Sequence, residues 1–151
     1  MPYQVDQSNK MESAGDTALA LSNDREYTIR IPAREKREAI RVLRWHPRGR
    51  RRVRVYLRLF AVALYHLVRE LPPEELVIID TEYTGHEKSI KNMLLALLWR
   101  DNPDFNANNI AFGHVGKKSP VHKKALAVYR GKAKADRTLT ARDLLSPITG
   151  L

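Results

Sequence analysis

Apolar and polar residues alternate with two different periods along this chain, and these periods predict strands and helices. In residues 26–31 (EYTIRI) every second residue is apolar, which is the period of a half-buried strand. In residues 53–70 the apolar side chains recur at three- and four-residue spacing, which predicts an amphipathic helix. Its apolar face consists of Leu57, Phe60, Ala61, Leu64 and Val68. Pro72 and Pro73 follow and end the helix.

The first part of the chain is predicted to form a meander. Short β-leaning segments at 3–6 (YQVD), 16–21 (DTALAL) and 26–31 are separated by turn-forming residues, so we expect three antiparallel strands. The stretch 34–45 leaves two interpretations open. Its apolar residues have helical spacing, whereas its segment RVLRW could extend a strand.

Strands and helices alternate through the second half of the chain. The segment 76–82 (LVIIDTE) is short, rich in β-branched residues and bounded by breakers, so it predicts a strand buried on both faces. A helix over 86–99 and a strand over 109–115 (NIAFGHV) follow by the same criteria. Ser119 and Pro120 fit the N-cap and first position of a helix that runs to about residue 130.

The order of these elements predicts an α/β domain with a mixed sheet. A length of 151 residues is enough for one sizeable core, so we expect a single domain over 1–151. Thr140 and Asp143 fit the capping pair of a last, shorter helix. Residues 138–151 could therefore form a C-terminal extension of the domain.

Composition bears on membrane association, secretion and disulfide formation. No apolar run approaches the roughly 20 residues that span a bilayer, so we expect no membrane association. The first residues lack the basic start and apolar core of a secretory signal. The chain has no cysteine, which excludes disulfides and thiolate metal sites. Together these features predict a cytoplasmic protein.

The charge balance points to a polyanionic partner. Lys and Arg total 27 against 17 acidic residues, which gives a net charge of +10. Such an excess attracts nucleic acid, either DNA or RNA. The basic residues gather in two blocks, although a solvated face is the simpler interpretation of any single run. The residues that we expect to contact nucleic acid are Arg48, Arg50, Arg51, Arg52, Lys117, Lys118, Lys123 and Lys124.

Two further features fit the same partner. The segment 113–119 (GHVGKKS) lacks the spacing of a nucleotide-binding P-loop, but backbone N–H groups at the following helix start, with Lys117 and Lys118, could hold a backbone phosphate. Trp45 lies beside the arginine block and is the aromatic side chain best placed to stack on a base.

Two acidic residues end the most apolar predicted strand. Asp80 and Glu82 are two positions apart, so strand geometry places both on one face. Carboxylates that crowd together repel one another and raise a pKa unless a cation binds between them. Oxygen ligands of this kind suit Mg²⁺. The alternative is that the two acids only end the strand.

This element order, with these residues, resembles the ribonuclease H-like superfamily of nucleases, resolvases and transposases. In that fold three antiparallel strands precede a helix, a central parallel strand, a helix, a further strand and a last helix. The resemblance covers roughly residues 3–137 and implies a mixed five-stranded sheet flanked by helices. The family's first catalytic aspartate lies on the first strand, where YQVDQSNK places Asp6. The next carboxylate ends the fourth strand, where VIIDTEY offers Asp80 or Glu82.

The resemblance implies a metal-dependent nuclease that uses Mg²⁺ or Mn²⁺ on DNA or RNA, including structured or branched substrates. Asp6, Asp80 and Glu82 would bind the metal, and His122 or Asp136 would complete the site. The loop and helix after the fifth strand resemble the family in shape and offer His114 as well as His122. Resolvases of this superfamily tend to be dimers, so the resemblance also allows a homodimer.

The chain departs from the family in its long helix. Members related to ribonuclease H itself carry a glutamate on the first helix, and here Arg58 and apolar residues stand where that acid is expected. Either the site uses fewer carboxylates, or Glu87 substitutes, or the activity has been lost. A non-catalytic nucleic-acid-binding protein on the same fold, or a subunit that sits on structured RNA, therefore remains an alternative.

Overall fold

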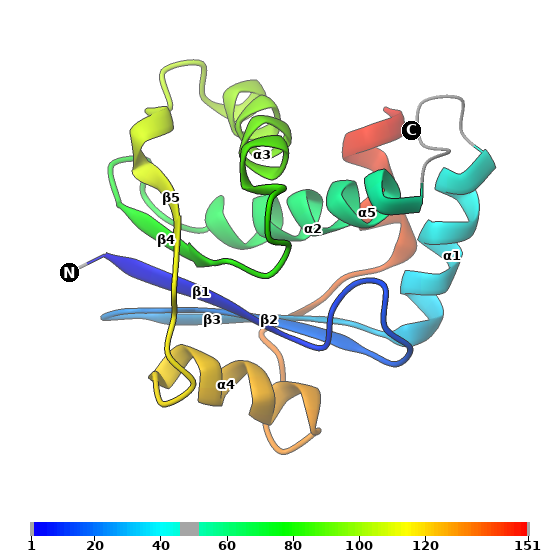
Figure 1. Ribbon diagram of the computed structural model, residues 1–151, viewed down its shortest axis with the longest axis horizontal. Coiled ribbons are helices and arrows are strands. Elements are labelled where there is room, and N and C mark those ends of the chain that lie inside the picture. The colour runs from blue at the N-terminus through cyan, green and yellow to red at the C-terminus, as the bar shows by residue number, and fades with distance from the viewer. Residues whose placement is uncertain (1, 46–51, 151) are drawn as a thin grey trace.

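One mixed six-stranded sheet organises the molecule (Figure 1). The computed structural model describes residues 2–45 and 52–150. The strands lie in the order β5-β4-β1-β2-β3-β6. Their bounds are Tyr3–Ser8 for β1, Thr17–Ser22 for β2, Glu26–Ile31 for β3, Val77–Asp80 for β4, Ile110–Gly113 for β5 and Arg137–Thr138 for β6.

Strand pairing follows the predicted meander and then becomes parallel. β2 pairs antiparallel with both β1 and β3, whereas β4 runs parallel to β1 and β5 runs parallel to β4. The predicted number of strands was wrong, because β6 adds a sixth strand parallel to β3. This strand has only two residues, Arg137 and Thr138, so it has no apolar alternation by which its sequence could have been recognised.

The helices cover the two faces of the sheet unequally. Figure 1 shows α2, α3 and α5 on one side and α4 on the other, with α1 at the end of the sheet towards which β1 runs. The ambiguous stretch 34–45 is helical. The bounds are Ala33–Trp45 for α1, Arg52–Val68 for α2, Glu87–Asp101 for α3, Pro120–Tyr129 for α4 and Ala141–Thr149 for α5, with a short 3₁₀ turn at Ala107–Asn109. None of the described helices is long and apolar enough to cross a membrane.

Several local predictions are confirmed. Ser119 caps α4, where its side chain accepts a hydrogen bond from the backbone N–H of His122. Thr140 and Asp143 form a reciprocal capping box at the start of α5. This last helix contacts α1 and α2, so the C-terminal segment packs against the rest of the fold.

Other local predictions need correction. Strand β4 ends at Asp80, so Glu82 lies beyond it. Ile78 is only half-buried, on the face opposite Val77 and Ile79. The apolar pattern of residues 86–99 would place Trp99 beside the core, yet it is 43% exposed, and its indole N–H donates to the Phe105 carbonyl.

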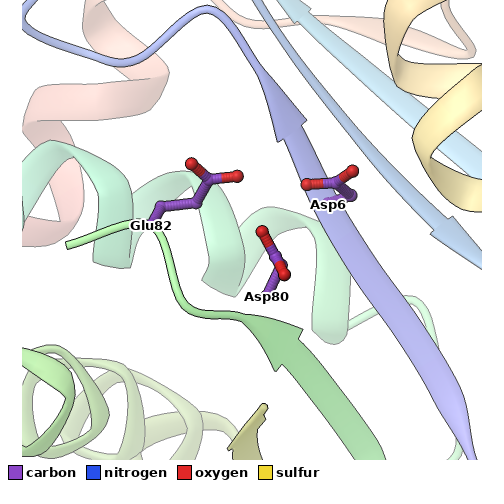
Figure 2. A group of neighbouring side chains, drawn as sticks. All are labelled: Asp6, Asp80 and Glu82. Atoms are coloured by element: carbon purple, nitrogen blue, oxygen red, sulfur yellow. The ribbon is translucent and has the colours of Figure 1, made fainter. Parts of the chain in front are cut away.

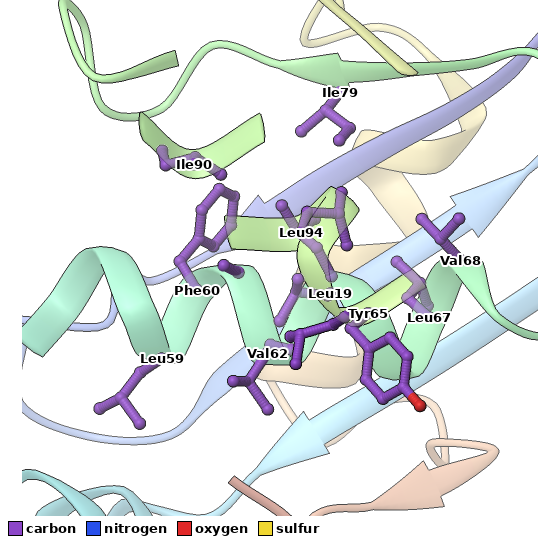
Figure 3. Close-up of a cluster of buried hydrophobic side chains, with 14 of the residues drawn as sticks. Leu19, Leu59, Phe60, Val62, Tyr65, Leu67, Val68, Ile79, Ile90 and Leu94 are labelled. Carbon is purple, nitrogen blue, oxygen red and sulfur yellow. The ribbon is translucent and has the colours of Figure 1, made fainter. Parts of the chain in front are cut away.

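The main core lies between the sheet and helices α2 and α3 (Figure 3). In β2, Leu19 and Leu21 point into this core, while Ala20 between them joins a second, smaller cluster under α4. Strand alternation explains the split. The second cluster has small members, Ala20 and Ala125, so α4 lies close to the sheet.

A buried lysine connects α1 to the β1–β2 turn. Lys36 is 2% exposed, and its ammonium donates to the Ser13 carbonyl at 2.7 Å and to the Thr17 hydroxyl at 2.9 Å. Burial lowers the pKa of Lys36 to about 8. These hydrogen bonds from Lys36 therefore hold the turn between the first two strands against α1.

We expect Lys36→Met to destabilise the protein by about 1–3 kcal/mol, because methionine fills the space of the lysine stem but leaves the Ser13 carbonyl without its donor. Urea unfolding measures the change. Lys88→Met, at an exposed position of α3, is the control and should change the free energy of unfolding by less than about 0.5 kcal/mol. Equal stabilities of the two variants would contradict the assigned role of Lys36.

Candidate metal centre

Three carboxylates converge at the carboxyl ends of two neighbouring strands. Asp6 lies on β1, Asp80 is the last residue of β4 and Glu82 follows two residues later. One ligand oxygen from each lies within 4.8 Å of the others. Figure 2 shows the three side chains pointing toward one another. The structure thus brings together the three acids that the sequence analysis selected.

Asp6 is almost completely buried and is satisfied by two hydrogen bonds. It is 3% exposed, and it pairs across the sheet with Ala20, so its side chain lies on the face that α4 covers. One carboxylate oxygen accepts the backbone N–H of Gln7 at 2.8 Å. The other lies 2.7 Å from Nδ1 of His122 on α4. Burial of the charge is tolerated because both oxygens have donors.

His122 therefore belongs to the site through its contact with Asp6. Because a carboxylate oxygen accepts, Nδ1 of the ring carries the hydrogen, and Nε2 is the nitrogen left to exchange a proton. The ring is held by its position one turn into α4, which Ser119 and Pro120 begin. Its side chain is 28% exposed, so the ring is accessible from solvent.

Asp80 is oriented by the chain that leaves β5. One oxygen of its carboxylate accepts the backbone N–H of Val115 at 2.7 Å. Val115 is buried and belongs to the small cluster under α4, so its backbone position is fixed by packing. The backbone N–H of Thr81 donates to the Gly113 carbonyl and continues the β4–β5 ladder by one more bond.

Glu82 is held in place by its neighbour Tyr83. The Tyr83 ring is buried against Phe60, with the two ring centroids 4.9 Å apart, and its hydroxyl accepts the backbone N–H of Met11. The segment after β4 is therefore anchored in the main core. This anchor, rather than regular strand alternation, fixes the direction of the Glu82 side chain.

The electrostatics of the cluster favour a bound cation. Burial, together with the neighbouring Asp6 and Asp80 carboxylates, raises the pKa of Glu82 to about 8. Three negative charges at this spacing repel one another. A cation between the three carboxylates would remove that repulsion and lower the pKa of Glu82.

The donor set fits a hard divalent metal. All three groups offer oxygen, which suits Mg²⁺ and Mn²⁺ better than soft ions. Ligands on opposite sides of one Mg²⁺ lie about 4.2 Å apart, since each bond is about 2.1 Å. A separation of up to 4.8 Å therefore needs only small side-chain rotations to place all three carboxylates on one ion.

Other predicted site residues lie elsewhere. Asp136 is not part of this group, because its carboxylate accepts hydrogen bonds from the backbone N–H and the hydroxyl of Thr28 on β3, two strands from β1. Glu87 also stays outside the group. It lies in the first turn of α3 and accepts the backbone N–H of Gly85, so it stabilises the start of that helix.

The predicted phosphate contacts lie on several elements of the fold. Lys117, Lys118 and Lys123 are exposed in the β5–α4 loop and on α4. Lys124 is half-buried and lies 3.8 Å from the Glu26 carboxylate. Arg52 begins α2. The predicted contacts Arg48, Arg50 and Arg51 lie outside the described residues.

Two supporting residues escaped the sequence analysis. Tyr83 fixes the acidic segment, and the backbone N–H of Val115 orients Asp80 across 35 residues of chain. Tyr83 is the one large aromatic residue in the polar segment that follows β4, and this could have suggested a buried ring. Nothing local to Val115 indicates its contact, because a backbone donor has no residue-type signal.

No protein-family model matches the chain, and no curated protein sequence matches it significantly. The functional interpretation therefore depends on the geometry of the site.

We expect the metal-free protein to lose stability as pH rises. The pKa of Glu82 is about 8 in the folded protein, against its usual 4.5, so protonation of this carboxyl favours folding. That contribution is complete below about pH 4.5 and is lost as pH rises through 8. Thermal midpoints measured in EDTA between pH 5 and 9 should fall, and Glu82→Gln should flatten the curve.

Glu74→Gln provides the matched control, because Glu74 is exposed in the α2–β4 connection. It should keep the slope of the wild-type curve. Added Mg²⁺ or Mn²⁺ should raise the midpoint mainly above pH 8 in wild type and less in Glu82→Gln. A Glu82→Gln curve parallel to that of wild type would contradict the assigned repulsion.

Proposed function

We propose that this protein is a divalent-metal-dependent nuclease that hydrolyses phosphodiester bonds in DNA or RNA. The observation that carries the proposal is the convergence of Asp6, Asp80 and Glu82, with His122 bonded to Asp6 on the same face. Phosphodiester hydrolysis needs several oxygen ligands at one point and a group that can move a proton nearby. This combination supplies both.

The topology supports the ribonuclease H-like interpretation. Three antiparallel strands come first, and β4 and β5 then run parallel to β1 on its other side. Helices α1 and α2 lie between β3 and β4, α3 lies between β4 and β5, and α4 follows β5. This order agrees with the one that the family resemblance implies, except that two helices, α1 and α2, precede β4 where the family has one, and that β6 and α5 follow α4.

The three acids and the histidine would have different roles in hydrolysis. Asp6, Asp80 and Glu82 would hold Mg²⁺ or Mn²⁺. When bound, the metal would activate a water and neutralise charge on the phosphate. His122 would accept a proton at Nε2 from the attacking water, or give one from Nε2 to the leaving oxygen, because its Nδ1 is committed to Asp6. Asp6 thus acts twice, as a ligand and as the group that orients the imidazole.

The surroundings of the site fit a polyanionic substrate. The backbone N–H of Val115 contacts Asp80, and the exposed Lys117 and Lys118 follow two and three residues later. Phosphates of the substrate would meet these lysines close to the acidic cluster. Binding through such contacts weakens steeply with salt, because each neutralised phosphate releases a counterion.

Asp80→Asn should reduce cleavage by at least about 100-fold in the presence of Mg²⁺ or Mn²⁺, because one charged ligand of the metal becomes neutral. Cleavage of labelled single-stranded, duplex, hybrid and branched oligonucleotides measures the effect. Asp104→Asn, at an exposed position of the α3–β5 loop, is the control and should retain the wild-type rate. Equal rates for the two variants would count against the metal site.

His122→Ala should lower the rate about 100-fold, within the usual range for loss of a general acid or base, while affinity for the oligonucleotide stays within about twofold. The pH dependence of the rate should lose one limb in this variant. His114→Ala is the matched control, since His114 is exposed in the adjoining loop. A wild-type pH profile in His122→Ala would show that the imidazole only supports Asp6.

A non-catalytic nucleic-acid-binding protein on the same fold is the second candidate. One observation favours it. Nucleases related to ribonuclease H itself carry a glutamate on the first helix, whereas α2 contains no acidic residue, and neither Glu35 nor Glu38 of α1 belongs to the acidic group found among the described residues. This candidate predicts no cleavage of any of the four substrate types with Mg²⁺ or Mn²⁺. It also predicts that Asp80→Asn binds them as tightly as wild type does.

A further inference from the structure

A basic and aromatic pocket lies between α1 and α2 and shares no lining residue with the carboxylate cluster. Its volume is about 510 Å³. It is lined by Arg37, Ile40, Arg41, Arg44, Trp45 and Tyr56. Figure 1 shows α1 at the end of the sheet towards which β1 runs, and β4 runs parallel to β1. Asp80 is the last residue of β4 and therefore lies at that same end. We refer to this pocket as the α1 pocket.

Trp45 is unusually exposed for its size. It is 81% exposed, whereas Trp99, Leu76 and Tyr129 are between 38% and 43% exposed. An indole in this state contributes little to the core, and its ring is accessible to a partner. The inward face of α1 is provided instead by Lys36, Ala39 and Leu43, all of them buried.

The arginines of the pocket form one stripe. Arg37, Arg41 and Arg44 are spaced by four and three residues, so they lie on the same face of α1. Arg41 is paired with Glu38 through two hydrogen bonds. Among the described residues, Arg37 and Arg44 make no ion pair within the chain. Their charges are available to an outside anion.

Helix stability alone does not explain this stripe. A cation in the last turn of a helix interacts favourably with the helix dipole, which accounts for Arg44. Arg37 lies in the second turn, where the dipole gives no such benefit. Basic side chains alone would also fit any phosphate, but the indole beside them adds a flat apolar surface. A nucleotide matches both features, because its phosphate can pair with the arginines and its base can stack on the indole.

We propose that the α1 pocket binds an unpaired nucleotide of a nucleic-acid strand, with the base stacked on Trp45 and the flanking phosphates on Arg37 and Arg44. The base must be unpaired because a duplex hides both faces of each base in its stack. This inference rests on the proposed function and adds that the substrate carries a single-stranded segment leading toward the acidic cluster.

Tryptophan fluorescence provides a direct test. In a Trp99→Phe background, Trp45 is the only tryptophan of the chain. Titration with a twelve-residue oligothymidylate or oligouridylate in EDTA and low salt should quench its emission. Anisotropy of labelled oligonucleotides should show that Trp45→Ala weakens single-strand binding on the order of 10- to 100-fold, and duplex binding less than about twofold. Trp45→Phe should restore most of the affinity.

The contribution of the arginines is measured separately, through the salt dependence of binding. Arg37→Gln and Arg44→Gln should each weaken binding and reduce the slope of log affinity against log salt by about 0.7 on a single strand. Arg25→Gln is the matched control. Arg25 is exposed in the β2–β3 turn, which the strand register places at the opposite end of the sheet. It should leave the slope unchanged.

Each outcome decides between the possibilities. The inference is wrong if a single strand binds without quenching Trp45 and binds equally well to Trp45→Ala. That result would leave the nuclease proposal intact, because it measures binding and not cleavage. Quenching by a mononucleotide at equal concentration would identify a nucleotide pocket and would also overturn the inference. If the wild-type protein binds no nucleic acid at all, both the inference and the proposed function fail.

Discussion

The buried carboxylate of Asp6 is the interaction on which the rest of the site depends. A charged group that is 3% exposed must have donors, and they come from the adjacent Gln7 N–H and from His122 on α4. The helix can supply His122 because small residues at the sheet surface, such as Ala20, allow a close approach. Burial of one aspartate thus fixes both the position of α4 and the direction of its histidine.

The same burial makes the cluster unfavourable in the absence of a cation. Asp80 and Glu82 lie beside Asp6, and burial together with these two neighbouring carboxylates raises the pKa of Glu82. Such an arrangement is stable in a folded protein when a metal or a proton removes the repulsion. The excess of basic residues outside the cluster then acts at longer range, where it attracts phosphates.

The β1–β2 turn links this cluster to the surface around α1. Tyr83 holds the turn from the side of β4 through the Met11 N–H, and Lys36 holds it from α1 through the Ser13 carbonyl and the Thr17 hydroxyl. Neither residue offers a ligand to the cluster. They keep the acidic residues and the α1 pocket in a fixed relation, which a strand that contacts both would require.

The sequence by itself determined the elements whose signal is local. Period-two alternation located β3, helical spacing located α2, and the caps at Ser119 and Thr140 located the starts of α4 and α5. Asp80 and Glu82 could be selected because they end the most apolar predicted strand, and Asp6 was selected through the resemblance to the ribonuclease H-like superfamily. Only the tertiary structure decided the 2.7 Å contact of His122 with Asp6, the exclusion of Asp136 and the short strand β6. These features depend on packing between residues more than 100 positions apart, on which local periodicity carries no information.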